Sequence, residues 1–394
     1  MSGQEWSATP LPPPGGDGPR VGDAGEARSE NSRPSPHPNP SPPGGGASQA
    51  EWWRPDAFAM RRPALEARAR ILSGLRLAFA EKGFTEVETP CLQVSPGMEP
   101  HIMALSAELA EPLAEGKRRL YLHTSPEFSM KKLLVAGMER IFQIARVWRD
   151  GERSPTHHPE FTMLEWYRAG EPYQALMEDC ATLLSTAARA AGVTEFRRGA
   201  RVCDPFAPFQ RLTLQQAFQQ YCGIDLLAAI DDDRAPTPDA LATEARRIGL
   251  YVSPNDSFED VFFRIMLERI EPHLGDGVPL ILCEYPVSMA ALSRPKPGDG
   301  RVAERFELYA CGLELANAFG ELTDPAEQRR RFEADMALKE RLYGVRYPVD
   351  DDFLTALDAG MPESSGIALG FDRLVMLATG AAGIDAVLWA PVVG

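Results

Sequence analysis

The sequence is short of basic charge and of long apolar runs. Its 41 Lys and Arg residues stand against 56 Asp and Glu, for a formal net charge of −15. That balance argues against a protein that holds nucleic acid by neutralising phosphates, because such binding needs a basic surface. The longest charge-free run near the C-terminus, residues 374–384, is too short to span a bilayer and ends at Asp385. The first residues have no apolar core behind a basic start, so we expect neither a membrane span nor a secretory signal.

Cysteine is also scarce. The six cysteines lie far apart and none forms a Cys-x-x-Cys pair, which argues against zinc sites and disulfide-exchange motifs of the usual spacing. Free thiols fit a reducing compartment better than a disulfide framework does. The sequence therefore predicts an acidic, soluble protein of the cytoplasm.

Proline and glycine, by contrast, concentrate at the N-terminus. Residues 1–50 hold 11 of the 35 prolines and 9 of the 33 glycines. Such a stretch cannot bury an apolar face, so a disordered tail is predicted there. We expect one folded domain over residues 52–394.

Periodicity predicts the elements of that domain. Ile71, Leu75 and Phe79 recur at helical spacing and indicate a helix over residues 64–82, which Gly83 ends. Strands rich in β-branched and aromatic residues are predicted over residues 120–123, 140–149, 159–168, 278–285, 305–309 and 365–370. Further helical segments are a mainly helical insertion over 171–280, with a break at 231–238, and a helix over 372–379. This order favours an α+β fold, an antiparallel β-sheet flanked by helices.

One more helix is predicted from the segment Thr124-Ser125-Pro126-Glu127 towards Gly137. Thr124 and Glu127 have the spacing of a capping box, with a proline in the first turn. The capping box alone explains this segment, and a ligand contact there is compatible with it.

The strand predicted over residues 159–168 presents an unusual face. Period-two geometry puts Phe161, Glu165 and Tyr167 on one side, with the carboxylate and phenol roughly 13 Å beyond the ring at about 3.3 Å per residue. Such a face suits a ligand with a flat ring at one end and a cation at the other. Arg149, at the edge of the facing strand, could bridge phosphate and carboxylate oxygens. The competing interpretation is an ordinary hairpin with a charged, solvated tip.

Four ordered segments resemble the class II aminoacyl-tRNA synthetases. Residues 140–167 resemble their motif 2 in its lysyl form, and residues 64–90 resemble motif 1, whose proline lies at the dimer interface. Residues 366–373 resemble motif 3, and residues 314–321 the acidic segment that holds Mg²⁺ and substrate. The resemblance covers residues 52–394.

Within the class II synthetases, further segments resemble one family in particular. Only the Pro/Gly tail precedes motif 1, so we expect the anticodon-reading domain of a lysyl-tRNA synthetase to be missing. Thr-Ser-Pro-Glu at 124–127, Pro-Glu-Phe-Thr-Met-Leu-Glu-Trp-Tyr at 159–167, Arg-Val-Ala-Glu-Arg-Phe-Glu at 301–307 and Ala368 are similar to the elongation factor P (R)-β-lysine ligase family. That family is a truncated lysyl-tRNA synthetase paralogue.

The resemblance implies a reaction and its partners. ATP, with Mg²⁺, would activate (R)-β-lysine or lysine as an acyl-adenylate, and a lysine side chain of elongation factor P would accept the acyl group. A homodimer is implied, while tRNA and a membrane are not expected as partners. Two alternatives stay open: a free-standing lysine-adenylate former that acts on tRNA or another carrier, and a non-catalytic regulatory paralogue.

The resemblance also assigns site residues. It implies that Arg149, Glu314 and Arg373 are catalytic. Arg149 would contact the α-phosphate and the substrate carboxylate, and Arg373 would contact the γ-phosphate. The expected ATP contacts are Arg149, Asp150, Gly151, Glu152, His157, His158, Phe161, Glu314, Leu315, Gly370 and Arg373. The expected substrate contacts are Ser125, Pro126, Glu127, Glu165, Tyr167, Asn317, Glu321 and Ala368.

Some assignments leave alternatives. Glu314 and Glu321 are expected to bind Mg²⁺, yet residues seven apart oppose each other on a strand unless a bulge, expected near 318–320, brings them together. The adenine-side contact belongs to either Gly151 or Glu152. Adjacent strand residues point to opposite faces, so His157 and His158 are not expected to chelate a metal together. Residues 100–117 carry no recognisable motif.

Overall fold

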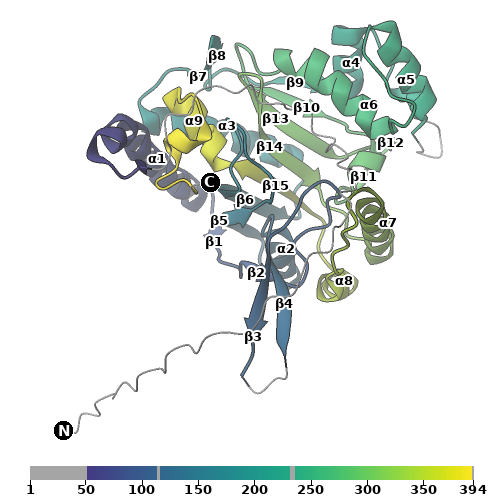
Figure 1. Cartoon of the computed structure of the whole chain (residues 1–394), viewed down its shortest axis with the longest axis horizontal. Coiled ribbons are helices and arrows are strands. Elements are labelled where there is room, and N and C mark those ends of the chain that lie inside the picture. Colours follow the sequence, from purple (N-terminus) through teal and green to yellow (C-terminus); the bar gives the residue numbers. More distant parts are fainter. Residues whose placement is uncertain (1–50, 113–115, 231–235, 393–394) are drawn as a thin grey trace, which may run out of the picture. The chain divides into compact units, whose positions relative to one another are not determined.

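The computed structural model describes residues 51–112, 116–230 and 236–392 (Figure 1). The predicted tail, residues 1–50, lies outside the described residues. Among the described helices, none combines the length and apolar character needed to cross a lipid bilayer.

An eight-stranded sheet forms the centre of the fold, in the order β1-β5-β6-β15-β14-β13-β10-β9. Its strands are β1 (Thr85–Glu86), β5 (Arg140–Trp148), β6 (Glu160–Ala169), β9 (Gln210–Thr213), β10 (Leu280–Cys283), β13 (Arg305–Ala310), β14 (Leu313–Gly320) and β15 (Ser364–Gly370). The inner pairs are antiparallel, as predicted, whereas the edge strands β1 and β9 run parallel to their neighbours.

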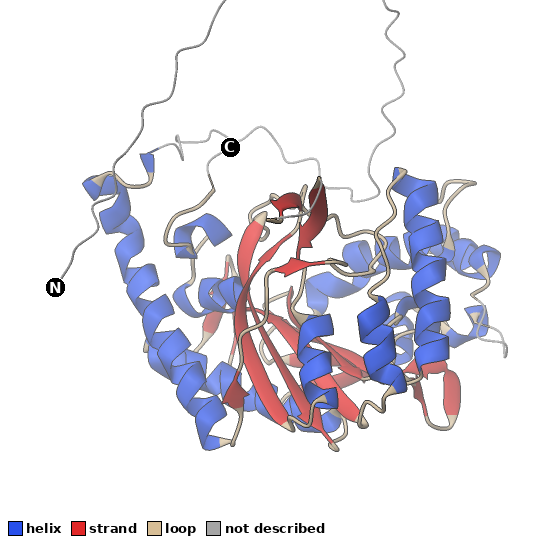
Figure 2. Ribbon diagram, turned by 90° about the horizontal axis from the view of Figure 1, so that it is seen from below, coloured by secondary structure: helices blue, strands red, loops and turns tan. Residues whose placement is uncertain are grey.

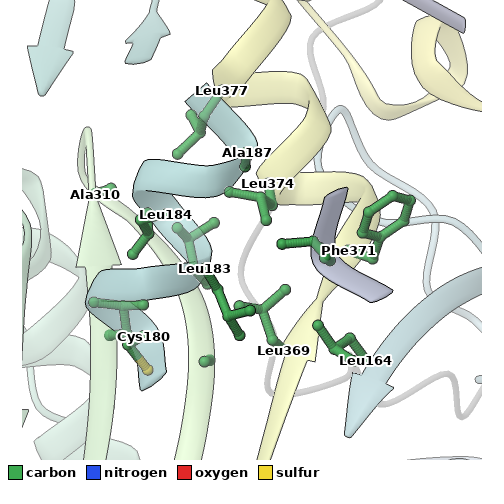
Figure 3. Packing of buried hydrophobic residues seen from close by; sticks show 14 of the residues in the cluster. Leu164, Cys180, Leu183, Leu184, Ala187, Ala310, Leu369, Phe371, Leu374 and Leu377 are labelled. Atoms are coloured by element: carbon green, nitrogen blue, oxygen red, sulfur yellow. The ribbon is translucent and has the colours of Figure 1, made fainter. Parts of the chain in front are cut away.

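Helices cover both sides of this sheet (Figure 2). One face packs against α1 (Pro55–Glu81), α3 (Gln174–Ala191) and α9 (Phe371–Thr379). In that core Leu183 and Leu184 of α3 meet Leu369 of β15 and Leu374 of α9 (Figure 3). Each fully buried leucine contributes about 1.5–3 kcal/mol relative to an exposed one. The opposite face meets α2 (Glu127–Val135), α7 (Pro325–Tyr343) and α8 (Asp351–Asp358) through a second apolar cluster.

Smaller elements complete the fold. The short strands are β2 (Leu92–Gln93), β3 (Ser106–Ala110), β4 (Lys117–Leu122), β7 (Phe196–Arg198), β8 (Arg201–Cys203), β11 (Pro295–Lys296) and β12 (Asp299–Ala303). The insertion helices are α4 (Leu214–Cys222), α5 (Pro238–Arg247) and α6 (Phe258–Ile265), followed by a π-helical turn, Met266–Ile270. The short strands β7, β8 and β9 lie between the helices of this segment. Most of its predicted break, residues 231–235, lies outside the described residues.

Two local predictions were wrong at helix starts. The first helix begins at Pro55, nine residues before the predicted start, and holds Pro63 inside it. An internal proline costs about 3 kcal/mol, which the packing of Ile71 and Leu75 against the sheet offsets. The capping box of α2 is absent, because Thr124 Oγ1 donates to Pro96 O at 2.9 Å.

Candidate active site

Five strands place side chains in one line across the face of the sheet opposite α1, α3 and α9. In register, Gln143 lies beside Glu165, Glu165 beside Ala368, Ala368 beside Asn317, and Asn317 beside Glu307. The alternation predicted for β6 is confirmed, since Leu164 and Trp166 enter the core on the other face. The sheet therefore carries a polar row at its middle, in which Gln143, Glu165 and Glu307 are buried.

A β-bulge in β14 brings its acidic residues onto this polar face. Tyr309 pairs with Glu314 and the preceding Leu308 with Ala316, so Leu315 is an extra residue. A bulge was expected near residues 318–320, but it lies four residues earlier. Because the extra residue restores the phase, Glu314, Asn317 and Glu321 all lie on the polar face.

Three carboxylates and a phenol meet at one end of the polar face. Glu165 accepts hydrogen bonds from Ser125 Oγ at 2.7 Å and from Tyr167 Oη at 2.6 Å. Glu127 and Glu321 share a buried cation, since Lys131 Nζ lies 2.5 Å from an oxygen of each. The predicted substrate residues at this end therefore come together in space. The residues Ser125, Pro126 and Glu127 also line a small pocket with residues 93, 95–97 and 99.

Sequence reasoning missed Lys131, which is fully buried. It lies one turn after Glu127 on α2, among the apolar residues of the helix's inner face. A lysine at an inward helical position beside acidic residues is the signal that could have identified it.

We call the cluster of Glu127, Glu165, Glu321, Tyr167 and Lys131 the carboxylate pocket. The protonation states of its members follow from their burial and from their closeness to one another. Burial, reinforced by the Glu127 carboxylate, raises the pKa of Glu165 to about 8. Burial likewise raises the pKa of Glu321 to about 7. Burial opposes the charge of Lys131, but Glu127 and Glu321 more than compensate and raise its pKa. Because Glu165 has only neutral hydrogen-bond donors, the pocket can accept a cation from a ligand.

The floor of the carboxylate pocket requires glycine at residue 366. A Cβ there would lie 2.2 Å from Tyr167 Cε1 and 2.4 Å from Glu321 Oε1. Ala368 and Gly370 follow at alternate positions of β15, so the strand presents little bulk to the polar face. Beyond it, Asn317 Oδ1 accepts a hydrogen bond from Arg305 Nε at 3.1 Å.

The other end of the polar face carries two arginines. Arg149 Cζ lies 5.3 Å from the ring centroid of Phe161, and Arg149 Nη1 lies 3.7 Å from a Glu152 oxygen. A planar cation over this ring marks a surface on which a flat ligand can stack. Gly151 adopts φ 78°, a conformation that favours glycine, and Asp150 N donates to Met103 O at 2.8 Å. The contact to adenine by Gly151 or Glu152 stays a prediction.

Arg373 lies in the first turn of α9. Its Nη1 donates to Glu314 O at 2.9 Å, and its Nη2 lies 2.7 Å from His157 Nε2. Because a guanidinium only donates, His157 Nε2 accepts, and Nδ1 bears the proton that faces Ser154 Oγ at 2.7 Å. No side chain caps α9 at Gly370, so its first N–H groups and helix dipole can attract an anion beside Arg373.

Acidic residues flank the arginines. Enclosure by the protein, with the nearby Glu307 carboxylate, raises the pKa of Glu314. Burial and the same two carboxylates, Glu307 and Glu314, raise the pKa of Glu271 to about 7. Glu307 is held by Tyr285 Oη at 2.5 Å and Tyr309 Oη at 2.6 Å. Neighbouring carboxylates beside an anion site are the oxygen ligands that Mg²⁺ prefers.

The expected Mg²⁺ pair of Glu314 and Glu321 stays a prediction. The two residues lie near opposite ends of β14, with Arg373 Nη1 3.7 Å from an oxygen of Glu314 and Lys131 Nζ 2.5 Å from an oxygen of Glu321. Glu307, on the neighbouring strand, is paired with Arg305 Nη2 at 2.6 Å. Within the described ranges, no group of three or more His, Cys, Asp or Glu could hold a metal by itself.

Two expected ATP contacts point away from this end. The His158 ring is 2% exposed, and its nitrogens bond backbone groups: Nδ1 lies 2.6 Å from Glu160 O and Nε2 accepts from Val392 N at 3.1 Å. Leu315 packs in the core on the opposite face of the sheet, which leaves only its backbone to contact a nucleotide. His157 and His158 thus face different surroundings, in line with the expectation that they do not chelate together.

Comparison with known proteins identifies similar sequences over most of the chain. A sequence model of the family "tRNA synthetases class II (D, K and N)" matches residues 58–393. A protein of Histophilus somni named elongation factor P--(R)-beta-lysine ligase is 38% identical over 338 residues, which cover 86% of this chain and 97% of that protein. Proteins of the same name from Salmonella arizonae and Haemophilus influenzae are each 39% identical, over 85% and 79% of this chain and 95% and 89% of theirs.

Proposed function

The chain belongs to the class II tRNA synthetase family, in the group of the elongation factor P (R)-β-lysine ligases, and we propose that it joins (R)-β-lysine or lysine to a lysine side chain of elongation factor P. It would do so through an acyl-adenylate made from ATP, with pyrophosphate and AMP as products.

The charge balance of the carboxylate pocket carries this proposal. Glu127, Glu165 and Glu321 face one internal cation, Lys131, which pairs with Glu127 and Glu321 and leaves Glu165 with only neutral donors. An ammonium-bearing ligand supplies the missing charge, since buried carboxylates need partners. Phe161 lies four residues along β6 from Glu165, so the amino acid and a stacked adenine fit on one face, roughly 13 Å apart.

The residues suggest how the reaction proceeds. A carboxylate oxygen of the amino acid attacks the α-phosphorus, and the bond to the β-phosphate breaks to release pyrophosphate. Arg149 and Arg373 would neutralise the anions that this step brings together and hold them in line. The acceptor amine then attacks the acyl carbon, an amide bond forms, and AMP leaves.

Mg²⁺ and a second subunit complete the proposal. Glu314 and Glu321 are the proposed Mg²⁺ ligands, and the ion would offset negative charge on the nucleotide. We further propose a homodimer that involves α1. A single monomeric species in sedimentation at micromolar concentration would contradict the dimer without affecting the rest.

Exchange of labelled pyrophosphate into ATP tests the first step. We expect exchange that depends on (R)-β-lysine or lysine. We also expect its loss in Arg149→Ala, because Arg149 is the cation found over the Phe161 ring among the residues that the structure describes. Glu160→Gln, a half-buried change on the same hairpin, is the matched control and should exchange normally. No exchange with lysine or either β-lysine isomer would refute the proposal, and favour a non-catalytic paralogue.

The acceptor is tested separately, by offering elongation factor P and bulk tRNA to the enzyme with labelled amino acid. Label on a lysine of elongation factor P supports the proposal. Label on tRNA alone would replace it with a free-standing synthetase.

A further inference from the structure

Lys339, on α7, is a buried ammonium group outside the proposed site. Its side chain is fully buried, and Nζ donates to the carbonyl oxygens of Glu99, Pro100 and Ile102 at 3.1, 3.1 and 2.5 Å. Three backbone acceptors use all three of its N–H groups, and no ion pair to it is found in the described part of the chain. An ammonium costs several kcal/mol to bury unless such partners compensate. The buried Lys339 ammonium therefore depends on the carbonyl oxygens of residues 99–102.

The same region of the chain fastens that segment at two further points. Ala104 N donates to Tyr347 Oη at 2.8 Å, and His101 Nδ1 lies 2.8 Å from Tyr343 Oη. Lys339 Nζ itself lies 4.6 Å from the ring centroid of Tyr347. Residues 99–104 are thus held from one side by α7 and the residues just after it.

Both halves of the proposed site touch this segment. At one end, Glu99 lines the small pocket that Ser125 and Glu127 also line. At the other end, Met103 O accepts the hydrogen bond from Asp150 N, the residue after Arg149. Residues 99–103 therefore connect the wall beside the carboxylate pocket with the start of the loop that carries the nucleotide contacts.

We propose that Lys339 is a positioning residue, whose ammonium sets the backbone of residues 99–102 and through it the wall of the amino-acid pocket and the loop after Arg149. It touches neither substrate. The identity of the amino acid in this inference rests on the proposed function. Residues 100–102 belong to the part of the chain that no sequence motif explained, and this role accounts for them.

The local charges agree with an ammonium that stays protonated at neutral pH. Burial lowers the pKa of Lys339 to about 8, against the opposing influence of Glu99. Asp335, one turn earlier on α7, is raised to a pKa of about 7 by burial and by Glu259 and Glu99.

The test compares Lys339→Met with Arg341→Met, an exposed change on the same helix. In Lys339→Met we expect amide hydrogen exchange of residues 99–104 and 150–153 to accelerate at least tenfold. We also expect the KM for the amino acid in pyrophosphate exchange to rise at least tenfold. Arg341→Met should match the wild type in both measurements, and Lys339→Gln, which keeps two N–H donors, should fall between.

The results separate the possible failures. A folded Lys339→Met protein with wild-type exchange in residues 99–104, or with a wild-type KM, would overturn the inference. If Lys339→Met does not fold, Tyr347→Phe removes the hydroxyl that accepts from Ala104 N and contacts Met103 Sδ, and it should show the same changes at smaller size. Unchanged values there would also overturn the inference. A wild-type protein without pyrophosphate exchange would refute the proposed function alone, because hydrogen exchange needs no activity.

Discussion

Glu165 is held by neutral donors, while the other two acids of the carboxylate pocket share Lys131. The chemical difference lies in the neighbours, since all three are buried glutamates. An acid that already has a cation is a structural partner, and one with only hydroxyl donors is available to a ligand cation. This assigns the ammonium contact to Glu165 ahead of Glu127.

Glu165→Gln tests that assignment. The amide keeps the shape and one acceptor for the hydroxyl donors but removes the charge, so a buried ligand ammonium loses about 3 kcal/mol. We expect the KM for the amino acid to rise roughly 100-fold, with the KM for ATP changed less than threefold. Pyrophosphate exchange at varied amino acid and ATP measures both, and an unchanged amino-acid KM would contradict the assignment.

At the scale of elements, α1 is tied to the first turn of α9. Arg68 forms a buried ion pair with Asp372, and its Nη2 donates to Thr162 Oγ1 at 2.8 Å. Asp372 also accepts from Thr162 N at 2.7 Å. One ion pair thus joins the first helix, the middle of β6 and the residue beside Arg373.

Removing this cation should destabilise the fold. Arg68→Ala leaves Asp372 buried and uncompensated, and we expect the free energy of unfolding to fall by about 3–5 kcal/mol. Arg62→Ala, which breaks an exposed pair with Glu66 on the same helix, should cost about 0–1 kcal/mol. Urea unfolding measures the free energy of unfolding of both variants. Equal decreases would show that the buried ion pair stabilises the fold no more than the exposed pair does.

For the whole molecule, unusually protonated acids set the response to pH. Glu165, Glu321, Glu271 and Asp335 have pKa values raised to about 8, 7, 7 and 7, from ordinary values of 4.5 for Glu and 3.8 for Asp. A folded state that binds more protons than the unfolded state is stabilised at low pH, and this stability is lost as pH rises through the folded pKa. The affected window runs from about pH 5 to 8.

We therefore expect the Tm of the ligand-free protein to fall between pH 5 and 8. The fall in Tm should be smaller in Glu165→Gln, because this variant has one acid with a raised pKa fewer. Saturating lysine should raise the Tm most near pH 8, where the carboxylates are ionised. Calorimetry across this range tests the expectation. A Tm that rises steadily with pH would contradict the raised pKa values.

Some strands and site residues of this molecule can be predicted from the sequence, and others cannot. Strands β5, β6 and β15 are predictable because their apolar alternation reflects burial on a sheet, and Glu165 and Tyr167 follow from the same alternation. Lys131 was missed because its importance comes from acids that only the tertiary fold brings near. The position of the bulge depends on pairing with β13, so the sequence of β14 alone did not locate it.

The bulge at Leu315 amounts to one extra residue in an otherwise regular strand. Without residue 315 the spacing from Glu314 to Glu321 is even, so Glu314, Asn317 and Glu321 share a face with no bulge at all. We expect a protein that lacks Leu315 to keep its amino-acid KM within about fivefold, despite the lost burial of one leucine. Deletion of Ala318 should instead put Asn317 or Glu321 on the wrong face of the sheet and raise the KM for the amino acid sharply. Equal effects of the two deletions would contradict this interpretation of the bulge.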